Sequence, residues 1–575
     1  MRTASRVLKS AHSARQLPAS LTPRSSLRPF RSLSGLAHSS RPSIRPCTTP
    51  IALTLPRQLL STTSPLRNES KPKEELKDEP KQEEIELEYE IDEDLSERKW
   101  STPLAKTIAE AIEVTGPIPL ASYMRMCLTA DLGGYYTGAL PASEANPERD
   151  PFGAAGDFVT SPEISQVFGE LCGVWFVAEW MAQGRPATGV ELMELGPGRG
   201  TLMDDMLRTM QRFPGIAKAL ERVYLVEASP QLRQAQKRLL CGDEAVLEGC
   251  EVGWKSRSKY GGVEIVWTES IRAVPMDPSK TPFIIAHEFF DALPIHAFQL
   301  VSVPASSDAK PSPIITSVSS PTPSPPQNPN LQWRELLVSP TPPGSTHASL
   351  NTPLSERSSP VPDFQLTLSP SPTKHSLYLP DSTPRYRRLK SLPPQQALNA
   401  TIEICPDLFS HTTNIAHRIG GHPTLNPKPH PSGAALILDY GPGDGSIPTS
   451  TLRGIRRHRR VSPFSEPGLV DLSADVDFQA IVDTALDASE GVEVHGPVEQ
   501  AFFLRAMGIA ERAGEIVKKV EAMGDQKKKG DVERAWQRLV DRGPGGMGRV
   551  YKALAIVPEA GGRRRPVGFG GDVVV

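Results

Sequence analysis

The sequence predicts an α/β fold with a Rossmann-like core, to which a helical N-terminal region and a small β insertion are added. Strand-like apolar segments recur between helical segments from residue 189 onwards, which is typical of parallel βαβ units. The first of these strands, ELMELGPGRG, ends in a glycine-rich turn directly before a helix. The second strand, RVYLVEASP, ends in the acidic residue Glu227. Together these observations predict a ligand site at the carboxyl ends of the strands.

Composition sets limits on this fold. The chain has 575 residues and is 38% hydrophobic, which is enough for two or three domains. It also contains 58 prolines and only 6% aromatic residues, so part of it is not packed core. The net charge of −2 gives no overall attraction to nucleic acid. Six scattered cysteines without a CxxC pair argue against a disulfide framework and a structural zinc site, and no metal site is expected.

The N-terminal segment has the composition of a mitochondrial transit peptide. Residues 1–68 contain no Asp or Glu and are rich in Arg, Ser, Ala and Leu. A disordered basic tail that binds an acidic partner is the alternative. The sequence then changes abruptly at Glu69 to an acidic run, which predicts a solvated linker up to residue 100. Cleavage on import is expected within 35–70.

Helical spacing begins near Ser101 and continues on both sides of the Gly116-Pro117 break. The longest apolar segment, ISQVFGELCGVWFVAEWMA, is interrupted by polar residues and predicts a helix with a buried face, not a membrane span. Before it, Ser161, Pro162 and Glu163 fit an N-cap, a first-turn proline and an acid that complements the helix dipole. A plain cap explains these three residues but not Gly156–Phe158 before them.

The glycine turn has the spacing G-x-G-x-G at Gly196, Gly198 and Gly200, not the dinucleotide spacing G-x-G-x-x-G. Glycines there let the backbone bend and let a ligand approach the main chain. Glu227 lies one βα unit later, where a carboxylate can accept hydrogen bonds from both hydroxyls of a ribose. The alternatives are an ordinary strand–turn–helix loop and a solvated carboxylate. Ser229-Pro230 is expected to cap the next helix.

A third strand region is expected in GGVEIVWTESI and a fourth over residues 283–286, followed by the loop His287–Pro294. From residue 302 to about 395 the chain is dense in Pro, Ser and Thr. This composition predicts loop insertions in a small sheet. LQWRELLV, FQLTL and HSLYL are its candidate strands.

Beyond this region, ALNATIEICPDLFSHTTNIAHRI predicts a helix and residues 433–441 a buried strand that ends in an acid and glycines. A basic segment follows that strand, so we interpret it as a late strand of the same sheet and not as a second glycine loop. The basic segment itself fits either a phosphate or acidic-protein site or a solvated face; its arginines are Arg453, Arg456, Arg457, Arg459 and Arg460. Asp471, Asp475 and Asp477 precede a helix, and a final strand contains Lys552.

We therefore divide the chain into seven parts. They are the transit peptide 1–68, the acidic linker 69–100, a helical region 101–188, the first part of the core 189–300, the Pro/Ser-rich small β region 301–395, the remainder of the core with C-terminal elements 396–560, and a disordered tail 561–575.

Several of these stretches together resemble one family, the mitochondrial complex I assembly factor protein-arginine methyltransferases with their bacterial relatives of the MidA type. The stretches occur in order across about 150–510: GDFVTSPEISQVFGELCGVW, ELGPGRGTLMDDML, YLVEASP, AHEFFDALPIHAF, ALILDYG, TLRG, DLSADVDF and FFLRAMGI. The long Pro/Ser insertions, the short PHPSGA segment and the Arg-rich run at 456–460 depart from the family. These departures affect inferences about the small sheet and its partner surface, not about the cofactor site.

The resemblance implies a class I methyltransferase core, S-adenosyl-L-methionine as cofactor and a place in the mitochondrial matrix. It implies symmetric dimethylation of an arginine on the 49-kDa subunit of complex I, and it allows a homodimer. Neither nucleic acid nor a membrane span is expected. The glycine loop with Glu194 would hold the methionyl part of the cofactor and Glu227 the ribose, while Asp157 and Thr160 would close over the site.

An arginine substrate arrives charged, since its pKa exceeds 12. Carboxylates can hold the guanidinium, orient a lone pair and later take the proton. We assign this role to Glu288, with Asp291 or Glu163 assisting; the alternative is that these acids only cap a loop. Two rival functions stay open: a non-catalytic assembly chaperone on the same fold, and a methyltransferase of a small molecule such as a quinone intermediate. A nicotinamide dehydrogenase is a more distant rival because the glycine spacing is wrong for it.

Overall fold

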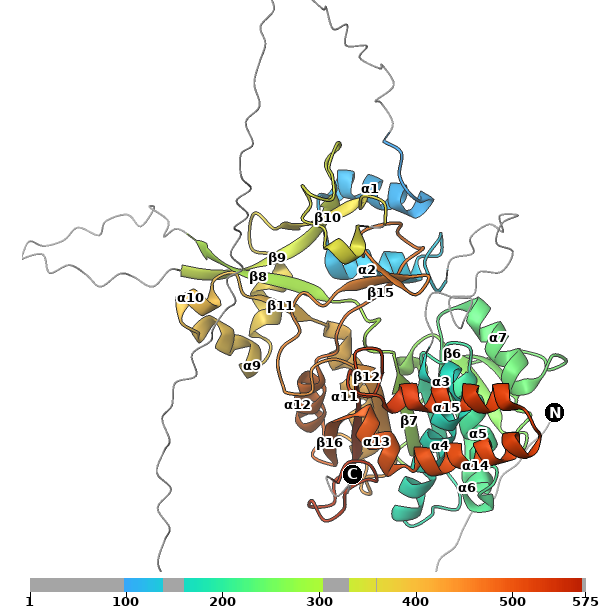
Figure 1. The fold of residues 1–575 in the computed structure, drawn as a ribbon. Coiled ribbons are helices and arrows are strands. Elements are labelled where there is room, and N and C mark those ends of the chain that lie inside the picture. Colours follow the sequence, from blue (N-terminus) through green and yellow to red (C-terminus); the bar gives the residue numbers. More distant parts are fainter. Residues whose placement is uncertain (1–97, 138–159, 304–329, 358, 571–575) are drawn as a thin grey trace, which may run out of the picture. The chain divides into compact units, whose positions relative to one another are not determined.

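The computed structural model describes residues 98–137, 160–303, 330–357 and 359–570 (Figure 1). The expected transit peptide and Asp157 lie outside these residues. A nine-stranded sheet forms the core, in the order β16-β17-β12-β7-β2-β3-β6-β5-β4. Its strands, in that order, are Val492–Glu499, Tyr551–Pro558, Ala434–Tyr440, Thr281–His287, Val190–Leu195, Leu220–Val226, Glu264–Thr268, Gly253–Arg257 and Glu248–Cys250.

The middle of this sheet is parallel. β12, β7, β2, β3 and β6 pair in parallel, β17 runs antiparallel between β12 and β16, and β5 with β4 forms an antiparallel edge. Alternate residues of β2 face different cores: Leu192 packs into one and Met193 into the other. Strands buried on both faces have near-continuous apolar runs, which explains these sequences; β2 departs from the rule at the buried acids Glu191 and Glu194. The predicted α/β, Rossmann-like fold class is confirmed.

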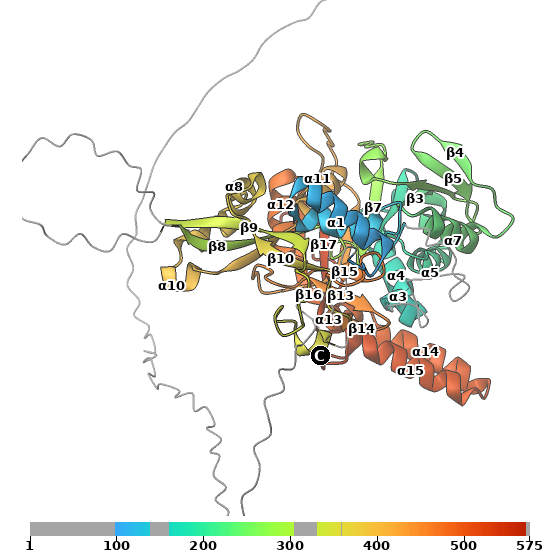
Figure 2. The same cartoon turned by 90° about the horizontal axis from the view of Figure 1, so that it is seen from above.

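Helices cover both faces of the sheet. α4 (Gln166–Ala182), α5 (Thr201–Met210), α13 (Gln500–Ala506), α14 (Ile509–Ala522) and α15 (Gln526–Val540) contribute to one core, and α11 (Pro406–Gly420) and α12 (Phe478–Ala488) to the other. Figure 2 shows α14 and α15 side by side. Further helices are α3 (Ser161–Ile164), α6 (Pro214–Ala219) and α7 (Pro230–Cys241). Within the described residues no helix is long and apolar enough to span a bilayer.

A second sheet has five strands, with β1-β9-β8-β11 in order and β10 paired to β9. These strands are Ile118–Pro119, Asn330–Pro340, His296–Val303, Thr401–Ile404 and Phe364–Leu368. α1 (Pro103–Thr115) and α2 (Leu120–Thr129) share a core with this sheet. The short helices α8 (Lys374–Tyr378), α9 (Pro384–Arg387) and α10 (Pro394–Ala397) follow β10. A three-stranded sheet has the order β14-β13-β15, over Arg459–Val461, Arg453–Arg456 and Asp471–Ser473.

The structure corrects three local expectations. The helix expected from residue 397 begins only at Pro406, because TIEI forms the edge strand β11. HSLYL lies mostly in helix α8, whose N-cap is Thr373, so it is not a strand. Thr160, not Ser161, occupies the N-cap position of α3.

The end of the chain also differs from expectation. Residues 561–570 were assigned to a disordered tail, yet the Trp175 indole N–H donates to the Val567 carbonyl at 3.1 Å. Phe569 is buried in the core beside Trp175. The many glycines and arginines of this segment predict fraying. The buried Phe569 ring, the hydrogen bond to the Val567 carbonyl and an ion pair between Arg564 and Glu179 instead hold it to α4.

Candidate active site

A cavity of about 1500 Å³ lies at the carboxyl ends of the parallel strands. Its wall contains the glycine loop after β2, the end of β3, the loop after β7 and the glycines after β12. Residues of β13, β15 and the start of β17 complete it. Ligands of open α/β sheets bind at this edge, so the cavity is the candidate active site.

The glycine loop has backbone angles that favour glycine. The φ angles of Gly196, Gly198 and Gly200 are 65°, 53° and 85°, all in the left-handed region. A Cβ on Gly196 would lie 3.0 Å from Phe289 Cδ2, and one on Gly200 would lie 3.3 Å from Gln236 Cγ. A side chain at either position would therefore strain the left-handed backbone and overlap with a neighbouring side chain. Gly200 is also the N-cap of α5, which directs the helix N-terminus at the loop.

Two buried carboxyl groups flank the loop. Glu194, at the end of β2, has no hydrogen-bond partner for its Oε2 among the described residues. Burial, and then the neighbouring Glu227, raise the pKa of Glu194 to about 8. The Glu227 carboxylate accepts the Ser229 backbone N–H at 2.7 Å, and burial raises its pKa to about 7. Both groups line the cavity, and a polar ligand there would supply the partner that Glu194 Oε2 lacks.

Gln236 links the glycine loop to Glu227 through hydrogen bonds. The sequence analysis did not identify this residue. Its amide nitrogen donates to the Gly198 carbonyl at 2.6 Å and to Glu227 Oε2 at 2.9 Å, while its oxygen accepts the Trp267 indole N–H at 3.0 Å. The side chain is fully buried on α7. A polar residue on the buried face of a helix was the available signal. Gln236 thus fixes the loop relative to Glu227.

Glu163 approaches the glycine loop from α3. Its Oε1 accepts the Thr201 hydroxyl at 2.6 Å, and its Oε2 lies 3.5 Å from Arg199 Nη1. The structure therefore places Glu163 on the glycine loop, with Thr160 on the same cavity wall. A role for Glu163 as a third catalytic acid stays a prediction, and so do the roles of Thr160 and Asp157.

A cluster of carboxyl groups follows β7 and β12. Glu288 has a φ of 50°, rare for a residue with a side chain, and its N–H donates to the Leu438 carbonyl at 2.9 Å. Asp291 accepts the Tyr440 hydroxyl. Asp439, which is fully buried, accepts the Phe290 N–H at 3.0 Å. Of these three acids, only Asp439 was not predicted as a site residue.

Tyrosines surround this cluster. The Tyr551 hydroxyl donates to Glu288, and Tyr136 donates to Asp471 Oδ1 at 2.8 Å. The rings of Tyr440 and Tyr551 meet edge-on at 5.3 Å between centroids. These tyrosines come from distant segments, so their proximity had no local sequence signal.

The cluster crowds three largely buried acidic groups together. Burial, and then Asp291, hold the pKa of Glu288 well above its usual range. Burial raises the pKa of Asp291 and that of Asp439 as well. Burial also lowers the pKa of His287 to about 3, so this imidazole, 3.3 Å from Glu288 Oε1, is neutral. The cluster is therefore suited to a cationic ligand, which would favour the ionised carboxylates.

Comparison with known proteins agrees with this geometry. The model of an S-adenosyl-L-methionine-dependent methyltransferase family matches residues 171–498. The chain belongs to this family. The methyltransferase is similar to the human "Protein arginine methyltransferase NDUFAF7, mitochondrial", with 32% identity over 80% of this chain and 84% of the relative. It is similarly 33% identical to the Drosophila melanogaster homolog of that protein, over 79% and 85%.

The methyltransferase also has a solved structural neighbour. This is a COG1565 superfamily member from Burkholderia thailandensis, crystallised with S-adenosyl-homocysteine. The TM-score is 0.53 at 22% identity, over 81% of this chain and 92% of the neighbour, which supports the shared fold. As a member of the matched family, the methyltransferase uses S-adenosyl-L-methionine as its cofactor. The glycine cradle, the unpartnered Glu194 oxygen and the adjacent Glu227 fit this group.

Proposed function

We propose that this chain is a mitochondrial protein-arginine methyltransferase. The acceptor would be an arginine on the 49-kDa subunit of complex I, methylated in the matrix to symmetric dimethylarginine. The names of the relatives support the arginine activity and the mitochondrial location. The 49-kDa subunit, the symmetric product and the matrix rest on the resemblance of the sequence motifs. The observation that carries the proposal is the acid- and tyrosine-lined pocket in the same cavity as the glycine loop.

The cofactor would be held at the glycine loop. S-adenosyl-L-methionine supplies a methyl group activated by its sulfonium. Gly196, Gly198 and Gly200 let the methionyl part lie against the backbone, and Glu194 accepts its ammonium. Glu227, held by Ser229 and Gln236, accepts the ribose hydroxyls. Thr160 lines the same cavity, and Asp157, outside the described part of the chain, stays a predicted cofactor-binding residue.

The guanidinium would be held by Glu288 and Asp291. A charged guanidinium pairs with carboxylates in a planar, two-point geometry. Its positive charge lowers the raised pKa values of these acids, so they ionise as the substrate enters. Alignment of the nucleophilic nitrogen then supplies much of the rate, and Glu288 takes the proton. Glu163 assists from the loop through Thr201.

A comparison of Glu288→Gln with Glu113→Gln, an exposed control on α1, tests this role. Glutamine keeps the shape but cannot take the proton, so methyl transfer should fall by about 10²–10⁴-fold with cofactor affinity kept. The measurements are calorimetric binding of S-adenosyl-L-methionine and methylation of the 49-kDa subunit, with the product identified by mass spectrometry. Unchanged turnover would remove Glu288 from the mechanism.

The same assay separates the rival functions. A folded wild type that binds no S-adenosyl-L-methionine would indicate an assembly chaperone. Cofactor binding with no transfer to the 49-kDa subunit would indicate a different acceptor. A Gly198→Val variant, in which a branched side chain is forced on a φ of 53°, should lose cofactor binding.

A further inference from the structure

A group of three potential metal ligands lies in the five-stranded sheet, apart from the cavity. It consists of His296 on β8, Glu335 on β9 and His375 on α8. None of the three lines the active-site cavity. We propose that His296, Glu335 and His375 form a binding site for a divalent transition-metal ion of the zinc type.

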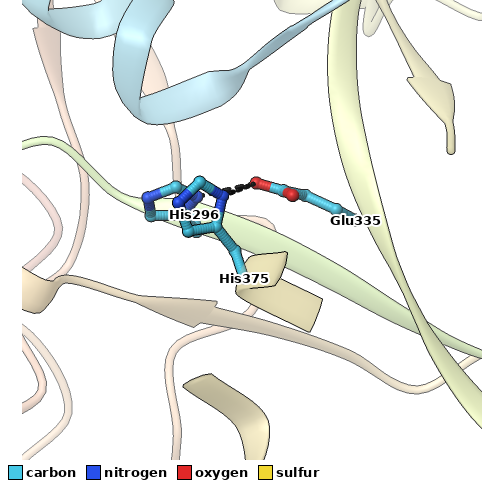
Figure 3. A group of neighbouring side chains, drawn as sticks. All are labelled: His296, Glu335 and His375. Carbon is cyan, nitrogen blue, oxygen red and sulfur yellow. Dashed lines mark hydrogen bonds and ion pairs between the residues drawn. The ribbon is translucent and has the colours of Figure 1, made fainter. Parts of the chain in front are cut away.

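The topology brings the three side chains to one face of the sheet. β8 and β9 are antiparallel, with Phe298 opposite Glu335. His296 precedes Phe298 by two residues, so its side chain points to the same face as that of Glu335. α8 lies against β9 and brings His375 to this face. Figure 3 shows both imidazole rings at the carboxylate end of Glu335.

The distances suit a shared ion. His296 Nδ1 lies 2.7 Å and His375 Nδ1 lies 3.3 Å from Glu335 Oε1. All ligand atoms of the group lie within 4.8 Å of one another. Tetrahedral zinc with bonds of about 2.0–2.1 Å places its ligands about 3.3 Å apart. His375 Nδ1 and Glu335 Oε1 already have this separation. His296 Nδ1 and Glu335 Oε1 would need to move apart by only a few tenths of an ångström, roughly the difference between 2.7 Å and the tetrahedral spacing.

The ligand set has the chemistry of such a site. Two imidazoles with one carboxylate are a common set for zinc and related ions, with the fourth position left to water. Glu335 is fully buried, whereas the His375 side chain is 45% exposed. The ion would thus reach a buried carboxylate from the solvent side, past His375.

A second layer of hydrogen bonds orders the carboxylate. The Thr373 hydroxyl donates to Glu335 Oε2, which leaves Oε1 for the histidines. The same hydroxyl accepts the Ser376 N–H at 3.1 Å and so caps the helix that carries His375. Outer partners of this kind orient metal ligands. An ion here would clamp α8 to the β8–β9 pair.

The test is cobalt and zinc binding by the purified full chain after treatment with a chelator. We expect one Co²⁺ per chain with a visible ligand-field band, displaced by Zn²⁺. His375→Ala should weaken this binding at least 10-fold, while His430→Ala, which changes an exposed loop histidine, should leave it unchanged. Because His375 is half-exposed, its variant should fold, and circular dichroism checks this.

Two results would overturn the proposal. One is a folded wild type that takes up no stoichiometric Co²⁺ or Zn²⁺, which would leave a hydrogen-bonded His–Glu–His array without an ion. The other is metal binding by His375→Ala equal to that of the wild type. A thermal shift provides an independent readout, since an ion that binds only the folded state raises Tm. That rise should occur in His430→Ala and be absent in His375→Ala and in Glu335→Gln.

Discussion

Two residues at the cavity, Glu288 and Glu194, are held in conformations or environments that are unfavourable for an isolated chain. Glu288 has a left-handed backbone, which costs on the order of 1–3 kcal/mol. The Leu438 carbonyl and Tyr551 fix it in place. Glu194 keeps a carboxyl oxygen without a partner. Such local costs are typical of sites arranged to meet a ligand.

The raised pKa of Glu194 predicts a pH-dependent stability. Its folded pKa of about 8 lies above the ordinary value of 4.5. The folded chain therefore binds more protons between these values, and stability falls as pH rises through this window. Glutamine carries no charge to bury, so Glu194→Gln should raise Tm at pH 9 relative to wild type and change it little at pH 5.

Thermal melts of the cofactor-free protein at both pH values measure this effect. The exposed Glu113→Gln variant is the control and should follow the wild type at each pH. An equal change in Tm for Glu194→Gln at pH 5 and pH 9 would contradict the titration of this group.

At the scale of elements, α4 packs closely against α5, the helix that begins directly after the glycine loop. Gly169 and Gly173 of α4 face α5, and a Cβ on Gly169 would lie 2.6 Å from Asp205 Cβ. Such overlap costs about 1–3 kcal/mol, so Gly169→Ala should lower the free energy of unfolding by that amount. Urea denaturation measures it.

Gly514 provides a matched control in helix α14, where an added Cβ meets nothing within 4 Å. Gly514→Ala should stabilise the protein by up to about 1 kcal/mol through helix propensity. If both alanine variants stabilised the protein, helix propensity and not interhelical space would control the effect of a side chain at the α4–α5 contact.

Elements with a local sequence pattern could be predicted from the sequence. Tertiary contacts between elements that are distant in the sequence could not. The strands ending at Leu195, Val226 and His287 have apolar runs bounded by turn residues, and the glycine spacing predicted the turn that precedes α5. TIEI was taken as helix because it is continuous with a helical pattern; its strand state depends on pairing with β8. Asp439 and Tyr551 join the site only through sheet order, and the His296–Glu335–His375 group only through tertiary packing.

At the scale of the whole molecule, the end of the chain is part of the core. Arg564 donates to both oxygens of Glu179 at 2.9 and 2.8 Å. Glu179 is buried, so loss of its partner leaves an uncompensated charge. Arg564 is 28% exposed, and water screens part of the effect. Arg564→Gln should therefore cost about 1–3 kcal/mol of unfolding free energy.

Arg563→Gln, at the exposed neighbouring residue, is the control for this prediction and should be close to neutral. Chemical denaturation measures the free energy of unfolding of both variants. Equal stability of the two would mean that the segment after residue 560 is held by Phe569 and Val567 alone.

The position of β17 has a consequence for synthesis of the chain. The strand Tyr551–Pro558 is inserted between β12 and β16, which precede it in the sequence. Until the ribosome has released these residues, β12 and β16 each keep a row of unpaired backbone groups, and Glu288 lacks Tyr551. A truncated product that ends before Tyr551 would thus present two open strand edges, the kind of surface that invites aggregation. Pairing of β17 therefore closes both strand edges and brings Tyr551 to Glu288 in a single step.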